Sequence, residues 1–407
     1  MPFSSSSQRN RSPARSARIL QPPQSDILFH RGRRRVIKGA LALGSLLALG
    51  TGGYLAAHWY GLFLPPLTTT DIGTIRALAW SPDGTYIALA KGPETQTVYD
   101  LTHIEVGTPG VQIWDAACGR VCVSYPTATD VMSLSWSPDS QWLASSVGDL
   151  VQIWARPSTE GRDGGRPVIK LAEAGQSTAD AIGGMVAWSP DGRRLASGKF
   201  NGELAVWDMH RKEVFWQITR PGDWCSALSW SPNSQHIALS TMLTYPRRPG
   251  WLGIVDANTG QVLLDLEYAD DTDAQGNVSL MWSPDGRFIA VGHPRTGDGS
   301  KGKVSILDAR TGKQIKAYFV KGRKDDPETP WVQAVAWSPD SRRIASTGYT
   351  YTIHMWDVMT DALVITYPPG PGVGTHASPT APLAWSPNGK HLASATDAVY
   401  VGIWDVP

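Results

Sequence analysis

Catalysis and metal binding need particular polar side chains at particular spacings, and this sequence offers few of either. The sequence contains no H-E-x-x-H pattern, no G-x-S-x-G elbow and no phosphate-binding loop. Its nine histidines are scattered along the chain: His30, His58, His103, His210, His236, His293, His354, His376 and His391. We therefore predict no catalytic residue, no cofactor and no enzyme activity.

The three cysteines, Cys118, Cys122 and Cys225, are too few for a disulfide framework and lack the spacing of zinc ligands. Cys118 and Cys122 flank an expected hairpin turn. They either pair across this turn in an oxidising compartment or stay as two thiols, because spacing alone does not set cross-strand geometry. Cys225 is expected to be a small buried hydrophobe.

An acidic stretch at 270–277 partly resembles a calcium-binding loop, with alternating oxygen ligands and a Gly at the turn. Such a loop needs a bidentate Glu eleven residues after Asp271, and Trp282 occupies that position. We therefore predict a solvated acidic loop and no metal site.

The formal charge of +1 is divided unevenly along the chain. Residues 1–64 carry nine Lys or Arg and one acid, Asp26, which gives +8. The totals of 37 basic and 36 acidic residues then leave 28 basic and 35 acidic residues after position 64, or −7. A phosphate backbone is repelled by this bulk charge, although a local basic patch is compatible with it. We predict no nucleic-acid partner.

Two short motifs alternate along the rest of the chain. Trp-Ser-Pro, then Asp or Asn, then Gly or Ser, occurs seven times, and an apolar residue followed by Asp comes after each copy except the second, which has Trp154-Ala155. Twelve of the eighteen tryptophans belong to these motifs, and we expect them to pack inside the fold: Trp80, Trp114, Trp136, Trp154, Trp188, Trp207, Trp230, Trp282, Trp337, Trp356, Trp385 and Trp404.

Each repeat predicts four short strands. Residues before the first motif alternate as in 226–230, which is the period of a strand with two distinct faces. Ser-Pro-Asp-Gly then supplies turn chemistry, because Pro presets φ, Asp caps the turn and Gly accepts a positive φ. A second strand follows, as at 194–197, then a third at 204–207 and a fourth at 214–219. Four strands make one propeller blade.

These residues resemble the WD-repeat family, and the resemblance covers Leu67 to Pro407. It implies an all-β fold, a seven-bladed propeller of four-stranded antiparallel blades over 65–407. The Gly-His dipeptide that the family usually has near the outer strand is absent from every repeat, so its buried His–Asp network is not carried over. Asp149, Asn201 and Asp397 alone stand at plausible positions for the network's acid. Blade seven lacks an outer strand at its C-terminal end, and we expect residues 67–72 to supply it and close the ring.

Loop lengths point to one face of the ring. In the family geometry, long connections such as 244–251, 321–331 and 368–382 share one rim, and insertions are free to become recognition surfaces. Three tryptophans lie at or near this rim, namely Trp224, Trp251 and Trp331. Exposed Trp is enriched in binding hot spots, although Trp at the base of a loop more often packs internally. They form our candidate surface for a protein or peptide partner.

The N-terminus predicts a membrane address. Residues 1–38 form an expected disordered basic tail on the cytoplasmic side, and 39–64 contain no charged residue over a length sufficient to span a bilayer. Arg33, Arg34 and Lys38 resemble a twin-arginine export signal, although Gly32 departs from it. Either export or simple anchoring places the propeller outside the cytoplasm. Small residues every four positions from Ala40 to Ala56 also allow a homodimer through this helix.

Sequence reasoning therefore favours a non-enzymatic, membrane-anchored propeller that acts as an interaction scaffold or sensor domain. One alternative is an extracytoplasmic propeller that binds a small ligand or peptide in its central channel, either enzymatic or similar to Tol-type periplasmic proteins. Those families lack the second Trp-Asp motif. Another alternative is cleavage of the signal segment and release of the propeller.

Overall fold

The computed structural model describes residues 74–407 with gaps. The gaps are 93, 99–101, 107, 149, 158–166, 172–183, 200–201, 220–222, 244–248, 267–278, 294–300, 322–331, 349–351, 368–381 and 396–400. The expected membrane segment 39–64 and the expected closing strand 67–72 lie outside the described residues. Every described residue belongs to the compact unit Trp59–Pro407. Within these residues, no helix has the length and apolar character to cross a membrane.

The chain folds as seven antiparallel sheets that follow one another along the sequence. The first strand of each sheet ends at the Trp of the first motif: β1 (Ile75–Trp80), β7 (Val131–Trp136), β11 (Met185–Trp188), β15 (Asp223–Trp230), β19 (Ser279–Trp282), β23 (Val332–Trp337) and β27 (Leu383–Trp385). The second strands follow the tight turn: β2 (Tyr86–Lys91), β8 (Trp142–Val147), β12 (Arg194–Gly198), β16 (His236–Leu243), β20 (Phe288–His293), β24 (Arg343–Gly348) and β28 (His391–Ala395).

The third strands end at the second motif, and the fourth strands form the outer edges. The third strands are β5 (Gly110–Asp115), β9 (Leu150–Ala155), β13 (Glu203–Asp208), β17 (Pro249–Asp256), β21 (Lys301–Asp308), β25 (Ile353–Asp357) and β29 (Val401–Asp405). The fourth strands are β6 (Arg120–Pro126), β10 (Ile169–Leu171), β14 (Glu213–Thr219), β18 (Val262–Leu266), β22 (Gln314–Lys321) and β26 (Ala362–Tyr367). The predicted four-stranded blades are therefore confirmed for blades one to six, and blade seven has three strands among the described residues.

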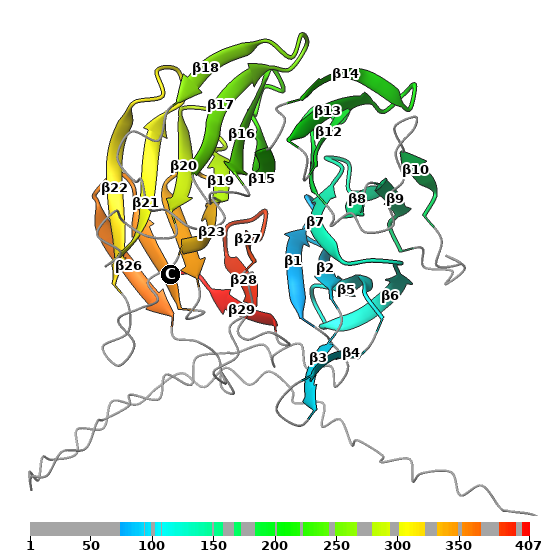
Figure 1. The fold of residues 1–407 in the computed structure, drawn as a ribbon. Helices are drawn as coiled ribbons and strands as arrows, with labels where there is room; N and C mark the ends of the chain where they lie inside the picture. Colours follow the sequence, from blue (N-terminus) through cyan, green and yellow to red (C-terminus); the bar gives the residue numbers. More distant parts are fainter. Residues whose placement is uncertain are drawn as a thin grey trace, which may run out of the picture. The chain divides into compact units, whose positions relative to one another are not determined.

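The blades form a closed ring. First strands of neighbouring blades contact each other in one cycle, from β1 through β7, β11, β15, β19 and β23 to β27 and back to β1 (Figure 1). Blades one and seven share a buried cluster in which Ile75 and Leu89 pack with Ala393 and Val401. Blade one thus meets blade seven directly.

Blade one contains the longest insertion, which forms a structure of its own. Between β2 and β5 the chain makes a separate two-stranded hairpin of β3 (Glu94–Val98) and β4 (Thr102–Val106). The extra length between the two motifs of this repeat therefore adds strands without altering the four-stranded blade.

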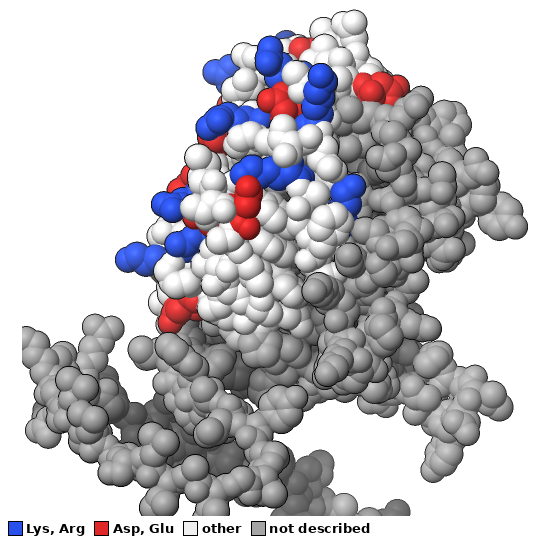
Figure 2. Space-filling view, turned by 90° about the vertical axis from the view of Figure 1, so that its left-hand side faces the viewer, with Lys and Arg blue, Asp and Glu red and all other residues white. Residues whose placement is uncertain are grey.

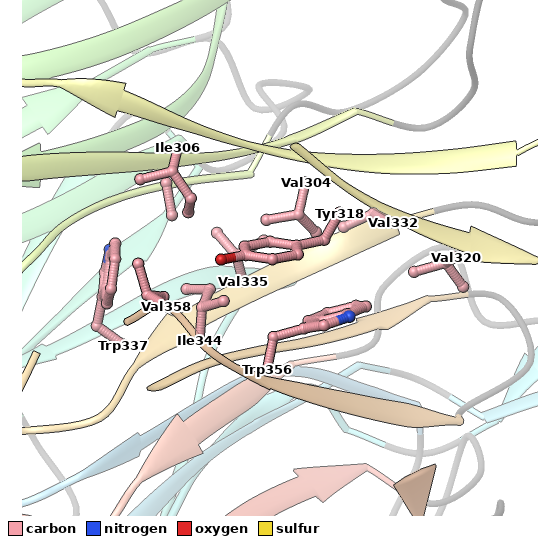
Figure 3. Packing of buried hydrophobic residues seen from close by; sticks show 11 residues of the cluster. Val304, Ile306, Tyr318, Val320, Val332, Val335, Trp337, Ile344, Trp356 and Val358 are labelled. Atoms are coloured by element: carbon pink, nitrogen blue, oxygen red, sulfur yellow. The ribbon is translucent and has the colours of Figure 1, made fainter. Parts of the chain in front are cut away.

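Apolar side chains fill the wedge between adjacent blades, because each four-stranded sheet must cover both of its faces. Figure 3 shows this between blades five and six, where Tyr318 lies over Trp356 with Val335 and Ile344 beside them. The two rings stack with centroids 5.3 Å apart and planes 18° apart. Burial and the Asp361 carboxylate, which accepts a 2.9 Å hydrogen bond from the phenol, raise the pKa of Tyr318 above its usual value. Offset stacking of this kind adds about 0.5–1.5 kcal/mol to area burial.

Candidate functional site

The seven tight turns share one hydrogen-bonded design. In each, the Ser hydroxyl bonds to the Asp or Asn two residues later at 2.5–2.8 Å, as Ser81 does to Asp83. In all seven turns the Ser oxygen also accepts the backbone N–H that opens the second strand, as from Tyr86. The fifth residue of every turn has a positive φ between 59° and 76°. The motif therefore encodes the turn itself.

Neighbouring turns touch, and the fifth residue determines how. Blades two, four and six have Ser there, and its hydroxyl accepts a backbone N–H from the turn of the preceding blade; the pairs are Asp83 to Ser140, Asp191 to Ser234 and Asp285 to Ser341, at 2.9–3.0 Å. Blades one, three, five and seven have Gly, which lies against a Pro of the preceding blade; the pairs are Gly84 with Pro387, Gly192 with Pro138, Gly286 with Pro232 and Gly389 with Pro339. The turns form one continuous rim.

The tryptophans of the first motif join blades in a second way. In blades two, four, six and seven the indole N–H donates to the carbonyl just before the corresponding Trp of the preceding blade, at 2.9–3.2 Å; the pairs are Trp136 to Ala79, Trp230 to Ala187, Trp337 to Met281 and Trp385 to Ala336. Blades three and five are joined to the preceding blade differently. The residue just before the Trp of the preceding blade is Ser135 or Ser229, and its hydroxyl accepts the backbone N–H of Trp188 or Trp282. These hydrogen bonds connect neighbouring blades.

The second motif also caps a turn, and blade two departs from it. In blades one and three to six, the Asp carboxylate accepts backbone N–H groups two and three residues later, as Asp208 does from His210 and Arg211 at 2.9 Å. Blade two has Ala155, which lacks this acceptor. Among the described residues, its outer strand is three residues long and begins opposite Ile153.

A groove of about 880 Å³ lies at this departure, between blades two and three. Blade two contributes Trp142, Ile153 and Val168, and blade three contributes Trp188 and Phe215 to the apolar lining. The side chains of Val168 and Phe215 are 56% and 45% exposed.

Some charged side chains of the groove already form hydrogen bonds within the protein, and others do not. Asp191 and Asp208 accept hydrogen bonds inside their own turns. Arg194 donates to the Ala257 carbonyl and the Asn258 side chain of blade four, and its guanidinium lies 4.6 Å from the centre of the Phe215 ring.

Arg193, His210 and Lys212 also line the groove. All three are exposed or partly exposed, and their side chains have no hydrogen bond or ion pair among the described residues. The groove thus combines an aromatic and aliphatic lining with a border of mixed charge, because its lining includes three Lys or Arg side chains and three Asp side chains. Such a surface suits a polypeptide that brings an apolar side chain and a carboxylate.

The structure separates the three tryptophans proposed from loop lengths. Trp251 is buried at 7% exposure, because its ring lies over Gly253, where any larger side chain would collide with it. It packs in the core between blades three and four. Trp224 lies in β15, and Trp331 is outside the described residues. The groove is at the rim of the tight turns, whereas the loops used for the prediction mostly lie outside the described residues.

The other candidate groups are also located. Cys118 and Cys122 are exposed free thiols and Cys225 is buried, so the pairing alternative is not the one observed. Within the described ranges, no group of three or more His, Cys, Asp or Glu is placed to hold a metal ion. The acidic stretch 270–277, the network candidates Asp149, Asn201 and Asp397, and the targeting residues Arg33, Arg34 and Lys38 fall outside those ranges.

The repeated turn, the hydrogen bonds of the tryptophans between blades and the ring of seven sheets define a β-propeller with tryptophan-rich repeats. A model of the WD domain, G-beta repeat, matches residues 119–154, 179–208 and 323–357. The chain therefore carries WD40 repeats in a seven-bladed propeller, as the sequence predicted.

This chain is similar to proteins whose names include WD repeats and to a ribosomal subunit protein. WD repeat-containing protein WRAP73 of Mus musculus is 24% identical over 69% of this chain and 53% of its own length. WD repeat-containing protein 1 of the same species is 24% identical over 46% of this chain and 35% of its own. The small ribosomal subunit protein RACK1y of Oryza sativa subsp. japonica is 25% identical over 33% and 34%. The chain spans about half or less of the length of these relatives.

Proposed function

We propose that this chain is a non-enzymatic interaction scaffold and that a protein or peptide partner binds in the groove between blades two and three. The observation that carries the proposal is the groove itself, which occurs at the one repeat whose second motif has lost its capping Asp. The relatives named above are called WD-repeat or ribosomal subunit proteins, and none of these names is that of an enzyme. A scaffold reuses a rigid fold and places its specificity in one surface.

A partner is expected to insert an apolar side chain against Phe215 and Val168, because exposed aromatic and aliphatic residues gain most from being covered. A carboxylate of the partner then faces Arg193 and Lys212 at the border of the groove. Charge pairs at such a border mainly raise the association rate and depend on salt.

The experiment is a crosslinking pull-down from intact cells that produce the full chain. The test variant is Val168→Glu/Phe215→Glu, and the matched control is Leu263→Glu, which alters a 49% exposed apolar residue on the outer strand of blade four. We expect a specific partner to be lost from the test variant and kept by the control. Equal retention by both variants would remove the groove from the account.

We also propose that residues 39–64 anchor the chain in a membrane with the propeller outside the cytoplasm. Support comes from the uncharged length of this segment and the basic residues that precede it. Alkaline extraction of membranes tests it: the full chain should stay in the pellet, and a variant lacking 39–64 should appear in the supernatant. Protease added outside intact cells or spheroplasts should cleave the anchored propeller if its orientation is as proposed.

A further inference from the structure

The hairpin of blade five carries a concentration of positive charge that no other described blade hairpin shares. Lys301 to Lys321, which form β21, β22 and their turn, include six basic residues and one acid, or +5. The corresponding segments 110–126, 203–219, 249–266 and 353–367 carry between 0 and −2, and segment 150–171 of blade two carries +2. The chain after position 64 carries a net charge of −7, so this hairpin is opposite in sign to the rest of the propeller.

The lone acid of the hairpin does not neutralise the lysines. Asp308 accepts hydrogen bonds from the backbone N–H groups of Arg310 and Thr311 and from the Thr311 hydroxyl, which hold its pKa below the ordinary value. Lys316 is occupied, since its ammonium lies 2.7 Å from the Asp361 carboxylate. Lys303 and Lys313 form no ion pair among the described residues.

Apolar side chains lie between these lysines. In the strand register Lys303 is opposite Phe319, so both project from the same face of the sheet. Phe319 is 51% exposed, and Ile315, which lies on the same strand at a β-bulge, is 45% exposed. The outer strand of the hairpin therefore presents two exposed apolar side chains, with Lys303 across from Phe319 on β21 and Lys313 in the turn that precedes β22.

Figure 2 views the side of the propeller on which β22 lies in Figure 1. Lys and Arg side chains, with some Asp and Glu among them, lie over the upper part of the described surface, next to an uncharged area. The hairpin ends in an edge strand, since β22 is the last strand of its sheet and pairs only with β21 among the described residues. An edge strand presents backbone N–H and C=O groups that another strand can pair with.

We propose that the outer face of β21 and β22 is a second interaction surface, which binds an extended acidic polypeptide segment with apolar residues between its acids. The acids meet Lys303 and Lys313, and the apolar side chains cover Ile315 and Phe319. The edge of β22 supplies main-chain pairing, a contact that a peptide can use and that an anionic lipid surface cannot. The surface lies on blade five and does not depend on the groove between blades two and three.

The experiment selects peptides from a random library displayed on phage, with the full chain as the immobilised target. Selected peptides are then synthesised, and their dissociation constants are measured at low and high salt. The test variant is Lys303→Glu/Lys313→Glu. The matched control, Arg211→Glu/Lys390→Glu, makes the same change in net charge at exposed residues of blades three and seven that do not line the groove.

We expect selection to enrich peptides in which Asp or Glu alternate with aliphatic or aromatic residues. These should bind the test variant at least about tenfold more weakly and the control unchanged, with affinity falling as salt rises. Hydrogen exchange should show that the bound peptide protects amides of 314–321. Unchanged melting temperatures show that the variants are folded.

Three outcomes would overturn the proposal. One is the absence of acidic sequences among the selected peptides. Another is equal binding to the test variant and the control. The third is binding of vesicles that contain phosphatidylserine, lost in the test variant, without binding of any acidic peptide, which would assign the patch to a lipid surface.

Discussion

The indole hydrogen bonds between blades can be tested by comparing Trp337→Phe with Trp282→Phe. Both tryptophans end a first strand, and they are 2% and 5% exposed. Each lies 6.2 Å from an aromatic ring of the preceding blade, Phe288 for Trp337 and His236 for Trp282. The Trp337 indole donates to the Met281 carbonyl at 3.2 Å, whereas the Trp282 indole N–H is buried with no hydrogen bond among the described residues.

The two substitutions remove similar apolar area, which costs about 1 kcal/mol at 25 cal/mol per Å² for the roughly 40 Å² that separate the two side chains. Trp337→Phe also loses a hydrogen bond and leaves a carbonyl short of a donor, which adds about 1–3 kcal/mol. Trp282→Phe loses no such bond and removes an unsatisfied N–H. We therefore expect losses of about 2–4 kcal/mol for Trp337→Phe and about 1 kcal/mol or less for Trp282→Phe.

Urea denaturation of the full chain, followed by circular dichroism, measures both losses. The comparison is valid where the variants and the parent chain have the same dependence of free energy on urea. Equal destabilisation of the two variants, or a larger loss in Trp282→Phe, would refute the assignment of ties between blades to the indole N–H groups.

Three further predictions concern pH, thiols and ring closure. Burial lowers the pKa of His293 from 6.5 to about 3, so its contribution to the free energy of unfolding is complete above pH 6.5 and is lost as the pH drops toward 3. In His293→Gln, urea titrations should show that the free energy of unfolding falls less over this pH range. Native labelling with a maleimide should modify Cys118 and Cys122, with Cys122 slowed by its raised pKa, and should reach Cys225 only after unfolding, because burial raises the Cys225 pKa to about 12; intact mass distinguishes two adducts from three. Deletion of 67–72 should lower the melting temperature if this segment completes blade seven, and an unchanged value would contradict that closure.

Much of the fold followed from the sequence because the repeat encodes local structure. Trp-Ser-Pro-Asp-Gly specifies a strand end, a turn and the next strand through bonds such as Ser81 to Asp83, all within a few residues. Counting the motifs then predicted the number of blades. The two kinds of contact between turns, by Ser140 or by Gly192, were not predicted, because each depends on a residue about fifty positions away.

The groove illustrates a different limit. The sequence identified Ala155 as a departure from the motif. The groove beside blade two could not be predicted from it, because its lining comes from side chains of two blades. Trp251 shows the reverse: its type and place beside a long connection suggested a surface residue, whereas Gly253 leaves room for the ring to lie flat and buried. Burial of a single side chain depends on its neighbours across the sheet, which periodicity does not identify.

The central claim, that a partner occupies the groove between blades two and three, is tested most directly by site-specific photocrosslinking in living cells. A photoreactive amino acid is placed at position 215 in the groove or, as the control, at position 263 on blade four of the full chain. We predict a discrete crosslinked product from position 215 that disappears when Arg193→Glu is added, and none from position 263. No product from position 215, or the same product from both positions, would contradict the account.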